Sequence, residues 1–301
     1  MQKQTKPPPQ VIDELRPGQS LELLKELHIL TRDGKLNQDT RRKLKQVYHL
    51  YQFIEPLISD VLKGDKAFTL ADHGAGKSYL GFILYDLFFN VAHAGTPPTG
   101  HVYGIETRPE LVEKSRTLAV RLGFERMSFL NLSVKDATGS ADLPGRIDIV
   151  TALHACDTAT DDAIAFGLAK QAQHMVLVPC CQAEVASVLK RTKGLNLTRT
   201  PLAELWRHPL HTREFGSQIT NVLRCLQLEA SGYSVTVTEL VGWEHSMKNE
   251  LILASRHDAP NGAKTGTAKV RLQQVLNELG LDGPALAELH HRFATTQDMT
   301  L

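Results

Sequence analysis

One stretch constrains the fold more than any other, the glycine-containing segment Ala71–Ser78 (ADHGAGKS). It lies between an apolar run, Ala67–Ala71, and an amphipathic segment that begins near Lys77. A strand, a glycine turn and a helix in this order build an anion- or nucleotide-binding corner, because the free N–H groups and the dipole of the helix start face the ligand. The sequence therefore predicts a ligand site here, and other segments must decide which ligand it holds.

This segment matches two patterns with different ligands. It fits A-x-x-x-x-G-K-S, a permissive form of the phosphate-binding P-loop, which would indicate a nucleoside triphosphatase. It also fits D-x-G-x-G-K, the first loop of methyltransferases that bind S-adenosylmethionine. The two interpretations place different demands on the strands that follow.

Strand-like apolar runs alternate with helical patterns along the chain. The expected strands are Ala67–Ala71, His101–Ile105, Met127–Val134, Arg146–Leu153, His174–Val178, Tyr233–Val241 and Glu250–Ser255, the last two joined as an antiparallel hairpin. The expected helices in this region begin near Lys77 or span Arg108–Leu122, Thr160–Gln171 and Glu214–Ala230. This alternation predicts an α/β fold, a Rossmann-like doubly wound, mostly parallel sheet with an antiparallel last strand.

The chain divides into four expected segments. Residues 1–19 are proline-rich and predicted to be a disordered lead, and residues 20–64 form a helical N-terminal extension. Residues 65–257 form the α/β domain, and residues 258–301 form a small helical tail with helices expected over Ala268–Leu279 and Gly283–Phe293. Residues 181–213 are less regular, with Arg207, His208, His211 and Arg213 as candidates for an anionic substrate or a solvated loop.

Composition excludes several classes of protein. The chain has 301 residues, of which 42% are apolar, and a formal net charge of +1, so no global field attracts nucleic acid or a membrane. The longest apolar stretch, Tyr79–Ala92, is interrupted by Asp86 and Asn90 and is shorter than the ~20 residues that span a bilayer. Four cysteines do not make a disulfide scaffold. We expect a cytoplasmic protein without a membrane segment, and the sequence does not predict an oligomeric state.

Polar residues at the expected strand ends favour the methyltransferase interpretation. Asp72, Glu106, Asp136 and His154 lie at or just past strand ends, so a parallel sheet gathers them on one rim. A carboxylate after the second strand, Glu106, can accept hydrogen bonds from both ribose hydroxyls of the cofactor.

The triphosphatase interpretation fits less well. It needs an apolar strand that ends in aspartate to hold magnesium together with Ser78. Asp148 comes too early in the fourth strand and Asp157 too late. Asp72 would also place a carboxylate where phosphates lie, which Coulomb repulsion disfavours and a cofactor carrying a sulfonium and an amine suits.

Two pairs of segments resemble a known family. DHGAGKSYLGF followed by GIETRPELVEKSR resembles motifs I and II of class I S-adenosylmethionine-dependent methyltransferases. ALHACDTATDDAI followed by VPCC is similar to the family that includes the Trm13-type tRNA ribose methyltransferases and the glutathione S-transferase C-terminal-domain-containing protein. The resemblance covers about Ala67–Ser255, and the chain departs from the pattern at Asp157 and Ser78, where glycine is usual or common.

The resemblance implies S-adenosyl-L-methionine as cofactor and a role for each matching residue. Asp72, Gly74, Ala75 and Gly76 would shape the methionine side, Glu106 would hold the ribose, Asp136 with Ala137 would face the adenine, and His154 and Asp157 would border the transferred methyl. Positioning is expected to dominate catalysis, since methyl transfer needs an in-line approach of about 3 Å.

The methyl acceptor is the least constrained part of the prediction. RNA is preferred, on the resemblance and on the basic cluster Arg41, Arg42, Lys43 and Lys45, which is otherwise a solvated helix face. A protein or small-molecule acceptor is the alternative within the enzyme class. A non-catalytic cofactor-binding module is a third possibility, because Asp157 replaces the usual glycine.

Two further constellations have competing explanations. Lys77, Asp157 and Lys248, with Glu239, match the residue types of a ribose methyltransferase site, but we prefer a helix-capping Asp157 and two ordinary lysines. His154, Cys156, Cys180 and Cys181 suggest zinc, but their spacing is not that of repeated C-x-x-C pairs, and we prefer buried cysteines without a metal.

Overall fold

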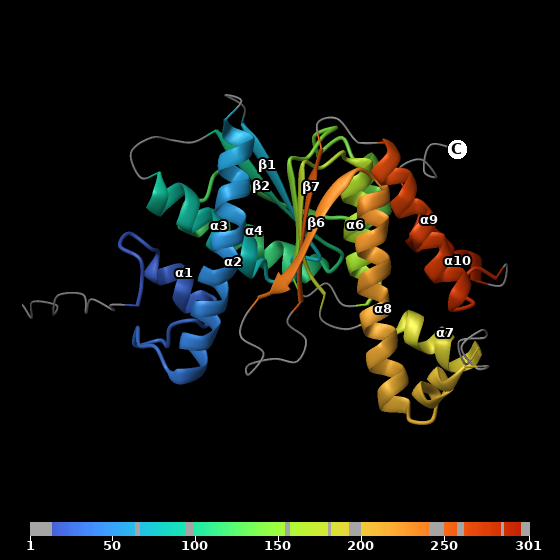
Figure 1. The fold of residues 1–301 in the computed structure, drawn as a ribbon. Coiled ribbons are helices and arrows are strands. Elements are labelled where there is room, and N and C mark those ends of the chain that lie inside the picture. Colours follow the sequence, from blue (N-terminus) through green and yellow to red (C-terminus); the bar gives the residue numbers. More distant parts are fainter. Residues whose placement is uncertain are drawn as a thin grey trace, which may run out of the picture.

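The computed structural model describes residues 14–63, 67–93, 99–153, 157–179, 182–192, 200–240, 250–257, 262–283 and 286–295. These residues include a seven-stranded sheet in the order β3-β2-β1-β4-β5-β7-β6. Figure 1 shows the sheet between its flanking helices. The strands are β1 Phe68–His73, β2 Gly100–Glu106, β3 Met127–Asn131, β4 Ile149–Leu153, β5 His174–Val178, β6 Tyr233–Glu239 and β7 Glu250–Arg256.

The pairing of the strands confirms the predicted fold class. β1 to β5 are parallel, whereas β7 runs antiparallel to both of its neighbours, β5 and β6. The strand order reverses between β2 and β4, which both flank β1. This switch point is where open α/β sheets bind ligands, beyond the carboxyl ends of the strands.

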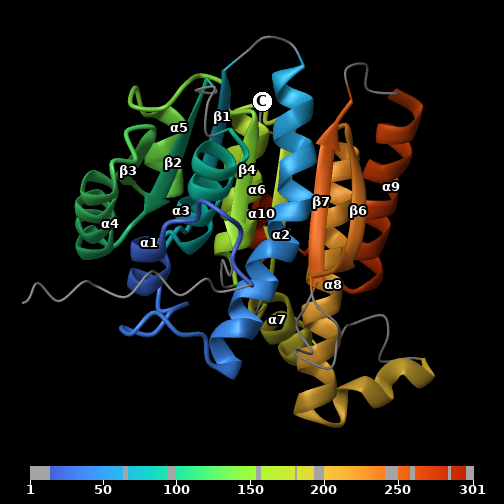
Figure 2. The same ribbon diagram turned by 90° about the vertical axis from the view of Figure 1, so that its left-hand side faces the viewer.

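Helices cover both faces of the sheet (Figures 1 and 2). On one face lie α1 Leu21–Glu26, α2 Gln38–Leu62, α3 Tyr79–Tyr85, the π-helix Asp86–Ala92 that continues α3, and α4 Pro109–Leu122. On the other lie α5 Val134–Gly139, α6 Ala159–Ala169 and α8 Pro209–Ala230. Outside α8, a third apolar cluster joins α7 Glu184–Thr192, α9 Gly262–Glu278 and α10 Ala287–Arg292, and a 3₁₀ helix, Pro201–Trp206, precedes α8.

Burial on both faces explains the continuous apolar runs. In β5, Val176 and Val178 pack into the cluster under α2 and α3, whereas Met175 and Leu177 pack into the cluster under α6. Successive side chains of a strand point to opposite faces, so a strand covered on both sides has no polar face to show. The predicted bounds of this strand, His174–Val178, are confirmed.

The segment just before α1 departs from prediction. Arg16 lies over the rings of Tyr48 and Tyr51, 5.2 and 5.0 Å from their centroids, and Gln19 is 8% exposed and hydrogen-bonds the Tyr48 hydroxyl. The expected disorder is therefore wrong for residues 14–19, and the rest of the predicted lead lies outside the described residues.

Several element boundaries also differ from the predicted ones. β3 ends at Asn131 because the Ser133 hydroxyl accepts the Asp136 N–H and starts the short helix α5. α8 begins at Pro209, five residues before the predicted start, since proline fits the first turn of a helix. α7 falls in the segment predicted to be less regular, and α9 begins at Gly262, before the predicted start at Ala268.

An arginine side chain caps one backbone carbonyl at the β3 edge of the sheet. β3 pairs only with β2 in the described sheet, and Arg116 of α4 donates from Nε and Nη2 to the outer strand's Phe129 carbonyl at 3.0 and 2.7 Å. The helices built from described residues include none with the length and apolarity needed to cross a membrane.

Candidate cofactor-binding site

The glycine segment forms a tight left-handed loop at the carboxyl end of β1. Gly74, Gly76 and Ser78 have φ of +64°, +57° and +51°. The Ala75 N–H donates to the Ile105 carbonyl at 3.0 Å, which fastens the loop to the end of β2. Ser78 takes a conformation that glycine adopts without strain, so its position explains why related loops often carry glycine there.

Asp72 supports this loop from below. Its side chain is buried, the Thr151 hydroxyl donates to Oδ1 at 2.8 Å, and the Gly81 backbone N–H donates to the carboxyl group. Burial raises the pKa of Asp72 to about 7. The carboxyl group therefore ties the start of α3 to β4, beneath the surface on which a cofactor would lie.

Glu106 is the anionic centre of the rim. Its side chain is 7% exposed, and Oε2 accepts the Gly76 N–H at 2.8 Å, so the end of β2 and the glycine loop are directly joined. Arg108 donates its backbone N–H and its guanidinium to the same carboxylate. Although burial opposes ionisation, these hydrogen bonds and the adjacent positive charge lower the pKa of Glu106 to about 2.

The residues predicted to face adenine lie in α5. Asp136 is exposed, and its Oδ2 accepts the Ser133 hydroxyl at 2.6 Å. Ala137 is fully buried in the core under α6, so its side chain packs rather than lining a ligand surface. The Asn131 amide donates to the Glu106 carbonyl at 3.0 Å, which holds the end of β3 beside that of β2.

Asp157 has the capping role that the sequence favoured. Its Oδ1 accepts the N–H groups of Ala183 and Glu184 at 2.8 and 3.3 Å, at the start of α7. Its φ is +52°, a left-handed value that glycine adopts freely. The usual glycine of the family and this aspartate thus suit the same turn, and the aspartate adds a helix cap.

A buried polar network beside Asp157 was not predicted. Arg224 of α8 is completely buried and donates to both oxygens of Asp161 at 2.7 Å, and to the Asp157 carbonyl at 2.9 Å. It also donates to Asn221, which accepts from Gln182 and donates to Glu250. The network therefore joins the segments after β4 and β5 to the start of β7. Mid-helix arginine in sequence looks like an ordinary exposed charge, so no signal identified it.

Another missed residue is His73, the last residue of β1. Its side chain is 5% exposed, and neither ring nitrogen has a hydrogen-bond partner. The ring lies 5.5 Å from that of Phe166, and burial lowers the pKa of His73 to about 4. The imidazole is therefore neutral, on the face of β1 opposite to Asp72.

Several predicted residues are not brought into this site by the described residues. His154, Cys156, Cys180, Cys181 and Lys248 lie outside them. Lys77 is exposed, without a hydrogen bond or ion pair to another described residue, and Glu239 is exposed at the end of the edge strand β6. Within the described ranges, no three histidine, cysteine or acidic side chains are grouped as a metal site would require.

The magnesium carboxylate needed by the triphosphatase interpretation is at the wrong end of the sheet. Asp148 precedes β4, where its Oδ2 accepts from the backbone and hydroxyl of Thr69 at 2.9 Å, near the start of β1. The other candidate, Asp157, caps α7. Ser78 is fully buried, which also removes the expected second ligand.

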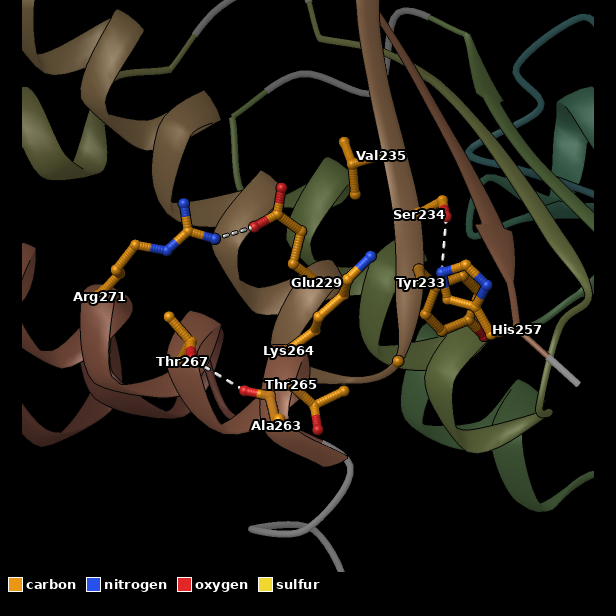
Figure 3. A pocket seen from close by; sticks show the side chains of 11 residues that line it. Glu229, Tyr233, Ser234, Val235, His257, Ala263, Lys264, Thr265, Thr267 and Arg271 are labelled. Atoms are coloured by element: carbon orange, nitrogen blue, oxygen red, sulfur yellow. Dashed lines mark hydrogen bonds and ion pairs between the residues drawn. The ribbon is translucent and has the colours of Figure 1, made fainter. Parts of the chain in front are cut away.

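A cavity of about 500 Å³ lies at the opposite, amino edge of the sheet (Figure 3). Arg271 bound to Glu229 and His257 bound to Ser234 frame it. Ser234 pairs with the end of β7, which in turn pairs with the start of β5, so this cavity is remote from the glycine loop. This cavity therefore takes no part in binding at the glycine loop and Glu106.

Comparison with known families decides between the two patterns. Residues 42–188 match a family described as a methyltransferase domain. The chain carries a methyltransferase domain. The Rossmann-like sheet places this domain in class I, whose members take the methyl group from S-adenosylmethionine, and the chain is accordingly an S-adenosylmethionine-dependent methyltransferase. No curated protein matches the sequence.

Solved methyltransferase structures are similar to this chain at low identity. One is the magnesium protoporphyrin IX methyltransferase from Synechocystis PCC 6803 with bound S-adenosylmethionine, at 15% identity over 78% of this chain and 90% of that chain, with a TM-score of 0.41. Another is Aeropyrum pernix fibrillarin, at 12% identity over 63% and 66%, with a TM-score of 0.37. A third is an rRNA methylase from Streptococcus thermophilus, at 11% over 63% and 86%, also with a TM-score of 0.37. Identities and TM-scores this low give no information about the methyl acceptor of this chain.

The rim of the methyltransferase domain has the groups that an adenosyl cofactor needs. Glu106 is an ionised carboxylate next to the glycine loop, suited to two vicinal hydroxyls. Gly74 and Gly76 leave the loop backbone without side chains, so a ligand can approach it closely.

Proposed function

We propose that this chain transfers a methyl group from S-adenosylmethionine to RNA. The observation that carries the cofactor half is the hydrogen bond between the Gly76 N–H and Glu106, which joins the glycine loop to the acid that follows β2. In this proposal Glu106 holds the ribose and Asp136 lies by the adenine. Gly74, Ala75 and Gly76 line the methionine side, and Asp72 keeps that loop in place from beneath.

The RNA half of the proposal is supported by the resemblance to Trm13-type tRNA methyltransferases and by the position of the basic cluster. Arg41, Arg42, Lys43 and Lys45 are exposed in the first turns of α2. Lys43 is close enough to Tyr79, the first residue of α3, to lower the pKa of that hydroxyl, which burial raises overall. The cluster therefore flanks the helix that follows the glycine loop, where a phosphate backbone could be held.

His154 and Asp157 are proposed to border the transferred methyl, Asp157 through its backbone and the α7 cap rather than as a proton carrier. A role for Lys77 and Lys248 at the acceptor stays a proposal of lower rank. The aspartate in place of glycine keeps the left-handed turn, so it gives no reason to expect loss of catalysis.

Two titrations and one labelling experiment test the function. Calorimetry should show binding of S-adenosylhomocysteine and none of ATP, and Glu106→Gln should weaken the former about tenfold or more, because the neutral amide offers one acceptor in place of two. Glu113→Gln, an exposed acid on α4, is the matched control. Binding of ATP alone, lost in Lys77→Ala, would reverse the assignment.

For the acceptor, protein with radiolabelled S-adenosylmethionine is incubated with fractionated cell RNA, protein and small molecules. We expect label in RNA. Replacing Arg42 and Lys45 by glutamine should reduce RNA labelling and make it less salt-dependent, without changing affinity for S-adenosylhomocysteine. Label in the protein or small-molecule fraction would show that RNA is not the methyl acceptor and would identify the acceptor class. Label in no fraction would favour a non-catalytic, cofactor-binding module.

A further inference from the structure

The carboxylate proposed to hold the ribose is covered by an arginine. Arg108 Nε donates to Glu106 Oε1 at 3.0 Å, and Nη2 donates to Oε2 at 3.1 Å, a two-point ion pair. The Glu106 side chain is 7% exposed and that of Arg108 is 59% exposed. The guanidinium thus lies on the solvent side of the carboxylate.

The same guanidinium reaches the glycine loop. A Cβ added to Gly76 would lie 3.7 Å from Arg108 Nη2. Arg108 therefore spans the gap between the two features that define the site, the loop after β1 and the acid after β2.

Local sequence sets this geometry. Arg108 precedes Pro109, and a residue before proline is kept out of the helical region, here at φ −89° and ψ +107°. In this conformation its N–H points back to Glu106 Oε1 at 3.1 Å. The side chain starts two residues from its partner, so closing the pair orders little additional chain.

The pair and a ribose compete for the same lone pairs. A carboxylate has about four acceptor positions. Oε1 already accepts from the Arg108 N–H, the Arg108 guanidinium and the Thr107 hydroxyl, and Oε2 from the Gly76 N–H and the guanidinium. Removing only the guanidinium leaves the Gly76 N–H on Oε2 and the Arg108 N–H and the Thr107 hydroxyl on Oε1. One position is then open on Oε2, and a second opens on Oε1 if the Thr107 hydroxyl, the longest of these bonds at 3.3 Å, gives way to a ribose hydroxyl.

We propose that Arg108 is a gate on the cofactor site and sets its affinity. It closes over Glu106 in the cofactor-free protein and moves aside when the ribose binds. This inference rests on the proposed binding of an adenosyl cofactor at Glu106. When a binding-competent state is only partly populated, the observed affinity falls by its fraction, and a half-exposed ion pair of this kind corresponds to about a fivefold penalty.

The test is calorimetric titration of S-adenosylhomocysteine into the wild type, Arg108→Gln, Arg108→Lys and a control. Arg108→Gln should bind about fivefold more tightly, because the open state no longer competes with the ion pair. Arg108→Lys, which keeps the charge and loses the fork, should lie between. Arg116→Gln is the matched control, since Arg116 is a similarly exposed arginine of α4 that bonds the Phe129 carbonyl instead, and it should be unchanged.

Salt separates a gate from a merely structural role. Raising sodium chloride from about 0.05 to 0.5 M screens the ion pair, so wild-type affinity should increase and that of Arg108→Gln should stay constant. Equal or weaker binding by Arg108→Gln, with normal thermal unfolding, overturns the gate and leaves the cofactor assignment standing. Failure of folded wild type and Arg108→Gln alike to bind S-adenosylhomocysteine overturns both.

Discussion

At the scale of single residues, Asp157 combines a cost and a gain. A left-handed φ costs a non-glycine residue about 1 kcal/mol or more. A side chain that caps a helix contributes about 1 kcal/mol in return. Asp157 has a left-handed φ of +52°, and its Oδ1 caps α7. The strain and the capping energy are therefore of similar size at this one position.

Substitution at Asp157 should separate these terms. Asp157→Asn keeps a capping oxygen and a residue type that tolerates this conformation, so its stability should be near wild type. Asp157→Gly loses the cap and the strain together and should also change little, whereas Asp157→Ala loses only the cap and should cost about 1 to 2 kcal/mol. Urea unfolding measures the order, and an alanine variant as stable as the glycine variant would contradict the capping role.

Two neighbouring residues of β1 respond to pH in opposite directions. The pKa of Asp72 is raised to about 7, so the stability that its protonated form provides is full below about pH 4 and lost as the pH rises to 7. The pKa of His73 is lowered to about 4, so its neutral form gives stability that is present above about pH 6.5 and lost as the pH falls towards 4. Between these limits the contributions largely cancel.

Substituting either residue should reveal how the other alone makes the free energy of unfolding depend on pH. In His73→Phe, nothing offsets the titration of Asp72. The free energy of unfolding of this variant should therefore fall as the pH rises from 4 to 6.5, by at most about 1.4 kcal/mol per pH unit. Asp72→Asn should show the opposite slope over the same range. Urea unfolding at pH 4.0, 5.2 and 6.5 measures both, and parallel profiles for the wild type and the two variants would show that neither group titrates as described.

At the scale of elements, sequence pattern found the strands better than the peripheral helices. A run such as His174–Val178 is apolar because both faces are buried, and that signal is visible without the fold. α5 has only six residues, which is too short for a helical period to show in the sequence. α7 lies within residues 181–213, where the sequence pattern is less regular. α9 starts with Gly262 and includes Gly266, which indicate a loop when taken alone.

In the candidate site, too, some residues could be predicted from the sequence and others could not. Glu106 and Asp72 were found because strand ends in a parallel sheet converge, whatever the packing around them. The gate on Glu106, the neutral His73 and the Arg224 network depend on which side chains meet across the fold. Single residues such as Arg108 carry no pattern, so only the structure assigns them a partner.

At the scale of the whole molecule, the N-terminal helices share the core of the sheet. Leu23 of α1 and Ile54 of α2 are completely buried in the same apolar cluster as Leu70 of β1 and Phe82 of α3. Asp86 of the π-helix also accepts the Ser20 N–H at the start of α1. The family match begins at residue 42, inside α2. These contacts lead us to expect one cooperative unit from α1 to β7.

A cavity in α2 tests this expectation. Ile54→Ala should lower the free energy of unfolding by about 2 to 5 kcal/mol and keep a single transition, because the helix and the sheet lose the same core. Val120→Ala, at a position 82% exposed, is the control and should stay within about 0.5 kcal/mol. Circular dichroism and tryptophan fluorescence follow the unfolding, and two separated transitions in Ile54→Ala would show that the helical extension unfolds independently.

The arginine on the Phe129 carbonyl makes the two border strands of the sheet unequal in their tendency to pair with other chains. An open edge strand is a template for edge-to-edge pairing and hence for aggregation. At β3, Arg116 occupies the Phe129 carbonyl and places a positive charge on the border. The border strand at the other end, β6, carries Val237 at 51% exposure. Protein stored at high concentration should therefore self-associate through β6, and a lysine at Val237 would give that border the protection that β3 already has.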